Sequence, residues 1–151
     1  MIVAQELTDS SADDVGTGLS LIDAVKTDIN SFTGDAAYDT LAIYEAAASR
    51  GAKVIVPPSK NAVVSKRKPR SRARDRTIKR IDKVGRRRWK TEPGYHRQGT
   101  VENAFSRYKR IVGDRLRSRH ADAQKTEAVI ACNVLNRLLE FGRPMSWARV
   151  A

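Results

Sequence analysis

The stretch between residues 30 and 56 constrains the fold of this chain most strongly, because it reads as a strand, a helix and a second strand in succession. Residues 31–35 form a short segment that ends in Gly-Asp, and residues 53–56 have the apolar pattern of a buried strand. Between them, Asp39 is a candidate N-cap for a helix that Gly51 would end. A Pro-Pro pair ends the second strand, since proline cannot donate to a sheet ladder. This order predicts a βαβ unit and an α/β fold with a parallel or mixed sheet.

Hydrophobic periodicity predicts further elements on both sides of this unit. Residues 2–7 read as a short strand and residues 17–30 as an amphipathic helix. Downstream, a basic loop and a turn-rich link are predicted at residues 60–74 and 91–99, and helices at residues 75–89, 100–112 and 122–141. The last two helices are expected to bury apolar faces, made of Val101, Ala104, Phe105, Tyr108 and Val112 on one and Val129, Ile130, Val134, Leu135, Leu138 and Leu139 on the other.

The charge of the chain is concentrated in its centre. The 151 residues carry a formal net charge of +12, and residues 60–90 alone hold 15 basic and 2 acidic side chains. Such a block repels itself unless a polyanion neutralises it, so nucleic acid is the expected partner. The ordinary alternative is a solvated basic linker. We expect contacts to DNA from the basic clusters of this block, namely Lys66, Arg67, Lys68, Arg86, Arg87 and Arg88.

Several classes of protein are excluded by composition. One cysteine and two histidines leave no disulfide framework and make a His/Cys metal site improbable, so any metal would be a hard ion on carboxylates. No apolar run reaches the roughly 18 residues of a membrane span, and no signal peptide is recognisable. The expected location is the cytoplasm, in association with the nucleoid. Trp89, Trp147 and Cys132 are read as core or surface-covering residues, although a tryptophan could also stack on bases.

Two carboxylates carry the candidate chemistry. Asp35 ends a predicted strand, and sites in open α/β sheets gather at the carboxyl ends of strands. Glu102 lies near the start of a predicted helix, with Tyr95 and Arg97 in the turn before it and Lys109 two helical turns after it. Taken singly, each acid has an ordinary structural explanation, as a turn residue or as a first-turn helix acid. Taken together, they could share a divalent cation, and magnesium suits such oxygen ligands.

These residues resemble a known family, the DDE transposases of bacterial insertion sequences. The sequence GDAAYD, residues 34–39, is similar to the segment around the second aspartate of that family. Tyr95, Glu102 and Lys109 fall on the spacing of the YREK signature, whose arginine position holds Gln98, with Arg97 beside it. The buried strand followed by Pro-Pro and a basic insert, and the helix over residues 127–137, are also similar. The resemblance covers most of the chain.

The resemblance implies a ribonuclease-H-like core with a C-terminal helical part and a basic insert at about residues 60–90. Three carboxylates of such a core hold two metal ions, Mg²⁺ or Mn²⁺, for in-line displacement at phosphorus. Asp35 would be the second acid and Glu102 the third, while Tyr95, Arg97 and Lys109 would hold DNA phosphates. The implied partners are the terminal repeats of the element and its target DNA, and a homo-oligomer on DNA stays open.

The chain departs from this pattern at its start. The first aspartate of such a core belongs to a strand before the one represented by residues 2–7, and the acids Asp9, Asp13 and Asp14 lie in a polar turn after it. We therefore expect residues 1–151 to be the C-terminal portion of a catalytic domain, truncated before its first strand and inactive alone. The alternatives are a non-enzymatic basic DNA-binding module and a ribosomal or chromosomal protein; the acidic, well-patterned first third disfavours the last.

Overall fold

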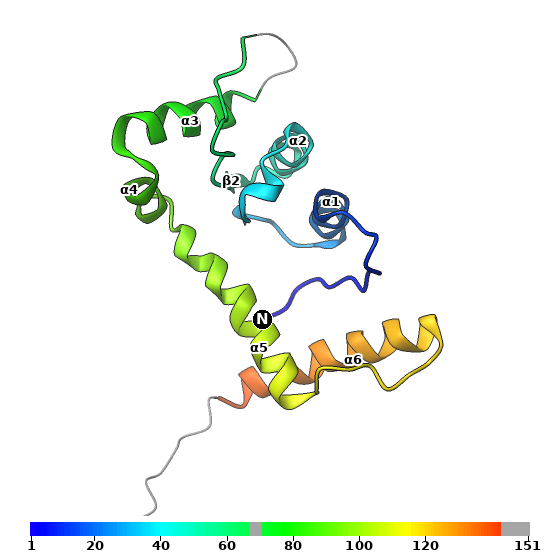
Figure 1. Cartoon of the computed structure of the whole chain (residues 1–151). Coiled ribbons are helices and arrows are strands. Elements are labelled where there is room, and N and C mark those ends of the chain that lie inside the picture. The colour runs from blue at the N-terminus through cyan, green and yellow to red at the C-terminus, as the bar shows by residue number, and fades with distance from the viewer. Residues whose placement is uncertain (67–70, 143–151) are drawn as a thin grey trace, which may run out of the picture. The chain divides into compact units, whose positions relative to one another are not determined.

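The computed structural model of the chain describes residues 1–66 and 71–142. It consists of two compact units: unit 2 is Thr8–Glu102, and unit 1 combines Met1–Leu7 with the chain from Asn103 onward. The elements are labelled in Figure 1. No helix in the described ranges is both long and apolar enough to cross a membrane.

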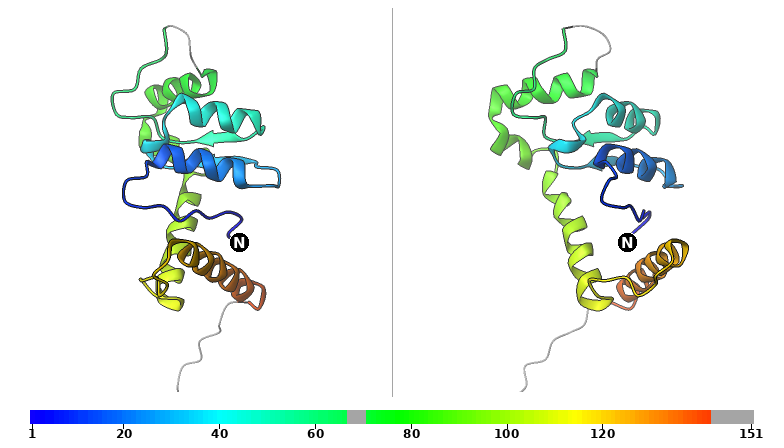
Figure 2. Two further views of the ribbon diagram at one scale, coloured as in Figure 1. Left: turned by 90° about the vertical axis from the view of Figure 1, so that its right-hand side faces the viewer. Right: turned by 45° about the vertical axis from the view of Figure 1, so that its right-hand side comes forward.

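Unit 2 contains the strand–helix–strand unit that the sequence predicts. Strands β1 (Ser31–Thr33) and β2 (Lys53–Ile55) pair in parallel, with Phe32 opposite Val54. Helix α2 (Leu41–Ser49) makes the crossover between them and packs on β2. Helix α1 (Asp14–Ala24) lies beside α2 (Figures 1 and 2). The prediction of an α/β fold is thus confirmed as a helix-rich unit around a two-stranded parallel sheet.

The core of unit 2 lies between this sheet and the helices that cover it. Its side chains come from α1, from α2, from β2 and its continuation, and from the helices after the basic loop. They are Ile22, Ile43, Tyr44, Ala47, Ile55, Val56, Pro58, Ile78 and Trp89. Trp89 is 5% exposed, which confirms its reading as a core residue.

Helix α1 is shorter than the periodicity of residues 17–30 predicts. It begins at Asp14, where the Asp13 carboxylate accepts a hydrogen bond from the Gly16 N–H, and it ends at Ala24. The Arg50 guanidinium donates to the carbonyls of Ile22 and Val25, both at 2.7 Å. A cation at the carbonyl end of a helix satisfies orphan acceptors and complements the helix dipole. Arg50 therefore fixes where α1 stops.

The basic insert forms two helices instead of the one expected over residues 75–89. Helix α3 (Arg72–Val84) starts inside the predicted loop, because the Ser71 hydroxyl caps it by accepting from the Arg74 N–H. Gly85 then adopts a φ of +82°, a conformation that favours glycine, and separates α3 from α4 (Arg86–Thr91). The break therefore lies at a residue that the sequence itself marks.

Two short 3₁₀ helices lie next to the candidate acids, and the second of them falls in the turn-rich link predicted at residues 91–99. The first, η1 (Ala36–Tyr38), follows β1, and the second, η2 (Tyr95–Gln98), follows α4 and contacts both α4 and β1. The predicted N-cap of α2 was wrong. Thr40 caps α2, and the Asp39 carboxylate instead binds residues of the basic insert.

Unit 1 is formed by two helices and the start of the chain. Helix α5 (Gly99–Ile111) begins in unit 2 and ends in unit 1, and α6 (Ala121–Glu140) follows a loop. The strand expected at residues 2–7 was wrong: these residues form no strand. Instead, the Asn136 side chain of α6 accepts from the Ile2 N–H at 2.7 Å and donates to the Ile2 carbonyl at 2.8 Å. The Asn136 amide thus satisfies the two backbone groups of Ile2 that a neighbouring strand would otherwise pair.

The apolar faces predicted for α5 and α6 are only partly buried in the structure. Helix α5 has no fully buried residue, and Phe105 is 64% exposed. In α6, Leu135 is buried as expected, together with Ala128 and Ala131. Cys132 is half-buried. The remaining predicted α6 core residues are exposed, namely Val129, Ile130, Val134, Leu138 and Leu139. Trp147 lies outside the described residues.

Candidate active site

Asp35 lies directly after β1, at the carboxyl end of the strand, as the sequence predicts. Gly34 extends the pairing, because its N–H donates to the Ile55 carbonyl at 3.4 Å. The Asp35 side chain is exposed, and one carboxylate oxygen accepts from the Ala37 N–H at 2.9 Å, which caps η1. A carboxylate has four lone-pair sites, so this single bond leaves acceptors for another ligand. Asp35 is therefore both a turn residue and an available oxygen donor.

The ring of Tyr38 fixes the turn that carries Asp35. It meets Phe32 edge to face, with ring centroids 5.5 Å apart. A Cβ added at Gly18 or Gly34 would lie 2.8 or 2.7 Å from a carbon of this ring, closer than packed atoms approach. The ring therefore occupies space that only glycine leaves free on both sides. Burial, with smaller contributions from the charges of Asp14 and Asp35, raises the pKa of Tyr38.

The pKa of Tyr95 is affected by the charges of both candidate acids. It opens η2, the segment that contacts β1 and leads into α5, and it is half-buried. Burial raises the pKa of Tyr95, and the negative charges of Asp35 and Glu102 raise it further. A carboxylate acts on a phenol in this way only when it is near, since solvent screens distant charges. Two acids that are far apart in the sequence therefore act on the same phenol within unit 2.

The surroundings of Tyr95 are aromatic and cationic. Its ring centroid is 6.2 Å from that of buried Trp89, and the Lys90 ammonium lies 4.9 Å from the ring centroid. That distance is within the range of a cation–π interaction. Trp89 thus packs beside Tyr95. Because the indole is buried, it has no free face for stacking on a base.

Glu102 and Lys109 occupy opposite ends of α5. Glu102 is exposed in the first turn, and Lys109 is exposed in the last turn, which belongs to unit 1. Arg97 and His96 are exposed in η2. In the part of the chain that the structure describes, no group of three or more His, Cys, Asp or Glu residues has metal-site geometry. Asp35 and Glu102 are both exposed and carry carboxylate oxygens, the kind of ligand that a hard cation prefers.

The predicted DNA-contacting cations lie in different settings. Lys66, Arg87 and Arg88 are exposed. The Arg86 guanidinium is half-buried and donates to the Ser59 carbonyl at 3.2 Å, so it is engaged within the protein. Arg67 and Lys68 lie outside the described residues.

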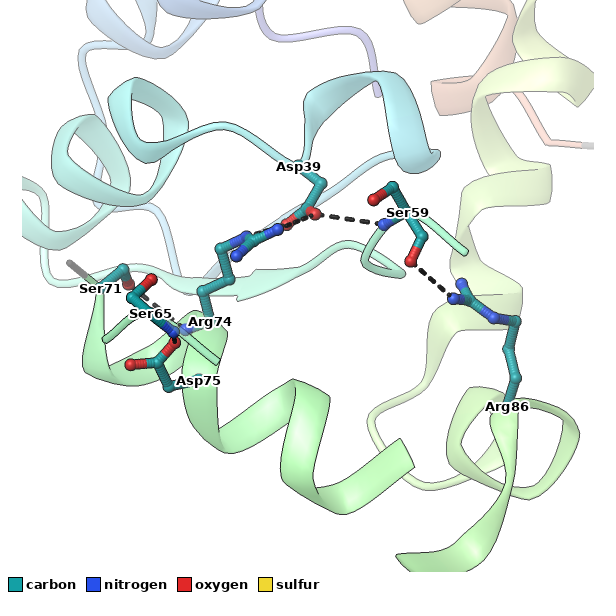
Figure 3. Close-up of polar contacts among 7 residues, drawn as sticks. All are labelled: Asp39, Ser59, Ser65, Ser71, Arg74, Asp75 and Arg86. Carbon is teal, nitrogen blue, oxygen red and sulfur yellow. Dashed lines mark hydrogen bonds and ion pairs between the residues drawn. The ribbon is translucent and has the colours of Figure 1, made fainter. Parts of the chain in front are cut away.

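A buried ion pair between Asp39 and Arg74 joins the turn after β1 to the basic insert (Figure 3). The guanidinium donates two hydrogen bonds of 2.8 Å to the two oxygens of the carboxylate, whose side chain is 3% exposed. The Ser59 N–H donates to the same carboxylate at 3.2 Å. These hydrogen bonds hold the pKa of Arg74 above its usual value. Sequence reasoning missed this pair, because 35 residues separate its members.

Nearby, Asp75 ties the loop before the insert to α3. It is a buried acid, and its carboxylate accepts from the Ser65 N–H at 3.0 Å (Figure 3). A further ion pair of the insert is exposed: Arg80 binds Glu92 through two hydrogen bonds of 2.8 and 2.7 Å. Three acids of unit 2 therefore bind internal donors around α3, while Asp35 and Glu102 are left exposed.

Comparison with known proteins identifies the family. The family model described as the transposase DDE domain matches residues 1–137, which is most of the chain. No curated protein and no solved structure matches. The match agrees with the resemblance found in residues 34–39 and 95–109, and it makes DNA the partner. The chain therefore belongs to the transposase DDE domain family, whose function is DNA transposition.

Proposed function

We propose that Asp35 and Glu102 are two of the metal-holding carboxylates of a phosphoryl-transfer centre that cuts and joins DNA at the ends of an insertion sequence. One observation carries this proposal: η2, the segment that leads into the helix start with Glu102, contacts β1, the strand after which Asp35 follows. Both side chains are exposed and present hard oxygens. In this reading the chain is of the YREK group, with a ribonuclease-H-like core.

A divalent ion bound there would polarise the phosphate and activate the attacking oxygen. The residues of the chain have other tasks. One oxygen of Asp35 accepts a hydrogen bond from the Ala37 N–H, which restricts the side chain and leaves the other oxygen available to a ligand. Tyr95 keeps its proton because burial and two carboxylates disfavour the phenolate, and it can donate to a phosphate oxygen. Arg97 can bind a phosphate bidentately.

We propose that this chain supplies two acids to a centre that uses three in the resembled family. Two carboxylates hold a pair of metal ions less well than three, so we propose that residues 1–151 alone do not cleave DNA. The ion would be Mg²⁺ or Mn²⁺, and the substrate DNA would be the terminal repeats and the target.

Metal binding tests the assignment of the acids without relying on activity. We would titrate Mn²⁺ into the chain and measure bound ion by electron paramagnetic resonance. Asp35→Asn and Glu102→Gln should each weaken binding at least tenfold. Glu45→Gln, at an exposed acid of α2, is the matched control and should bind as the unsubstituted chain does. Unchanged binding by either test variant would remove that acid from the site.

Cleavage tests the proposal of inactivity. The chain would be incubated with Mg²⁺ and labelled duplexes that carry the terminal repeats of its element. We expect no strand cleavage. Robust cleavage that Asp35→Ala abolishes would contradict the claim that two acids are too few, while supporting the assignment of Asp35.

A further inference from the structure

Helix α3 carries four cations on one face. Arg72, Arg76, Lys79 and Lys83 follow one another at steps of four, three and four residues and are all exposed. At about 100° per residue they fall within a sector roughly 60° wide. The buried Ile78 and half-buried Ile81 lie on the opposite side of the helix. We call these four residues the cationic stripe.

The acids near α3 leave the cationic stripe without partners. Asp39 binds Arg74 and Glu92 binds Arg80, two arginines that lie outside the stripe sector. Asp75 is buried and holds the Ser65 N–H, and Asp82, the exposed acid of α3 itself, forms no ion pair in the described ranges. In residues 1–66 and 71–142, no member of the stripe forms an ion pair, and the one side-chain hydrogen bond is from Arg76 to the Arg72 carbonyl at 3.3 Å. The helix therefore pairs other arginines internally and leaves its outward cations free.

Such an arrangement opposes helix stability unless an anion is present. Like charges three and four residues apart repel each other on a helix surface. Arg72 also lies in the first turn, at the positive end of the helix dipole. The stripe extends over about 16 Å at 1.5 Å per residue. Duplex DNA carries about one phosphate per 1.7 Å of its axis, so each of the four cations can meet its own phosphate.

The ion pair between Arg74 and Asp39 fixes the helix that carries the cationic stripe. Arg74, between Arg72 and Arg76 in sequence, is fixed to Asp39, which lies four residues after Asp35. Figure 3 shows α3 tied to the turn after β1 through this pair. The stripe is thus part of the unit that carries Asp35 and Glu102 and does not belong to a loose basic loop.

We propose that the cationic stripe of α3 binds the sugar–phosphate backbone of duplex DNA and holds it on the unit that carries the candidate acids. The inference rests on the proposed function for its substrate and adds the surface that binds it. Ammonium and guanidinium groups on an exposed helix meet phosphates of any sequence, so this contact supplies affinity and register without reading bases. Its members differ from the clusters that the sequence indicates at residues 66–68 and 86–88.

The test compares two variants that lose the same charge. The stripe variant replaces Arg72, Arg76, Lys79 and Lys83 by Gln. The control variant replaces four exposed arginines of unit 1 by Gln, namely Arg110, Arg115, Arg117 and Arg119. Binding of a fluorescent 30-base-pair duplex is measured by anisotropy without metal, from 50 to 200 mM salt. Circular dichroism verifies that each variant keeps its helices.

We expect the stripe variant to bind more weakly and with a shallower salt dependence. Four lost phosphate contacts lower the slope of log K against log salt by about 3.6, so the unsubstituted chain should lose roughly 150-fold more affinity than the variant over this range. The control should keep a slope within one unit of the unsubstituted chain. An unchanged slope in the stripe variant, or equal losses in both variants, would overturn the inference. If the unsubstituted chain binds no duplex, the proposed function falls with it.

Discussion

Removing one partner of the buried Asp39–Arg74 pair should destabilise unit 2 far more than removing one partner of the exposed Arg80–Glu92 pair. Both pairs have two hydrogen bonds of 2.7 to 2.8 Å, so their geometry is matched. They differ in burial, because the side chains are 16% and 3% exposed in the first pair and 45% and 32% in the second. The comparison therefore isolates the effect of the environment on one kind of bond.

The magnitude follows from what each truncation leaves behind. Asp39→Ala leaves the Arg74 guanidinium largely buried without its carboxylate and leaves the Ser59 N–H without an acceptor. Breaking a buried pair costs about 3–5 kcal/mol, and the residual exposure of Arg74 places the expected loss near 3 kcal/mol. Adding Arg74→Met to Asp39→Ala should recover most of that loss, because no uncompensated charge remains. The exposed pair should show little coupling, since solvent screens it.

Urea unfolding followed by Trp89 fluorescence, in a Trp147→Phe background, measures these free energies. Each pair is studied as a double-mutant cycle, with Arg80→Met and Glu92→Ala as the counterparts in the exposed pair. Similar coupling energies in the two cycles would refute the reasoning, because burial would then have no effect. A loss below about 0.5 kcal/mol for Asp39→Ala would refute it as well.

Three further predictions concern other sites. Hydrogen bonds from the N–H groups of residues 117 and 118 lower the pKa of Glu127 below 4.5. Its carboxylate therefore stabilises the folded state above that value, and this stabilisation is lost as the pH falls through the lowered pKa. Glu127→Gln should lower the melting temperature at pH 7 and not at pH 2. Gly34→Ala should displace the Tyr38 ring and destabilise by about 1–3 kcal/mol in urea unfolding, and a neutral result would show that the ring can move. Tyr44→Phe should leave stability unchanged or raise it by up to about 1 kcal/mol, because its buried hydroxyl has no partner among the described residues; a clear loss on calorimetry would reveal one.

Local sequence signals predicted the elements that local interactions define. The strand–helix–strand unit was predicted from residues 30–56, because periodicity, a glycine stop and a Pro-Pro end all act within a few residues. The division of the basic helix at Gly85 was missed, although the glycine was visible in the sequence. Asp35 at a strand end and Glu102 in a first helical turn were likewise placed correctly, since each position follows from its neighbours.

Features that depend on distant partners were not predictable in this way. The end of α1 is set by Arg50, which lies 28 residues after Ile22, whose carbonyl it binds. Asp39 has the local signature of a helix cap, yet a guanidinium 35 residues away takes its carboxylate. Residues 2–7 have strand-like composition, but the groups that satisfy Ile2 come from a side chain of α6. In each case tertiary hydrogen bonds overrode a sound local propensity.

The hydrogen bonds between Ile2 and Asn136 impose an order on the folding of the chain during its synthesis. The two residues are separated by 134 positions, so on the ribosome the first waits for the second. At about 5–20 residues per second, that wait is roughly 7 to 27 s. All of unit 2 leaves the exit tunnel during this time and can collapse on its own contacts. Unit 1 is completed after unit 2, once Asn136 has been made and can bind Ile2.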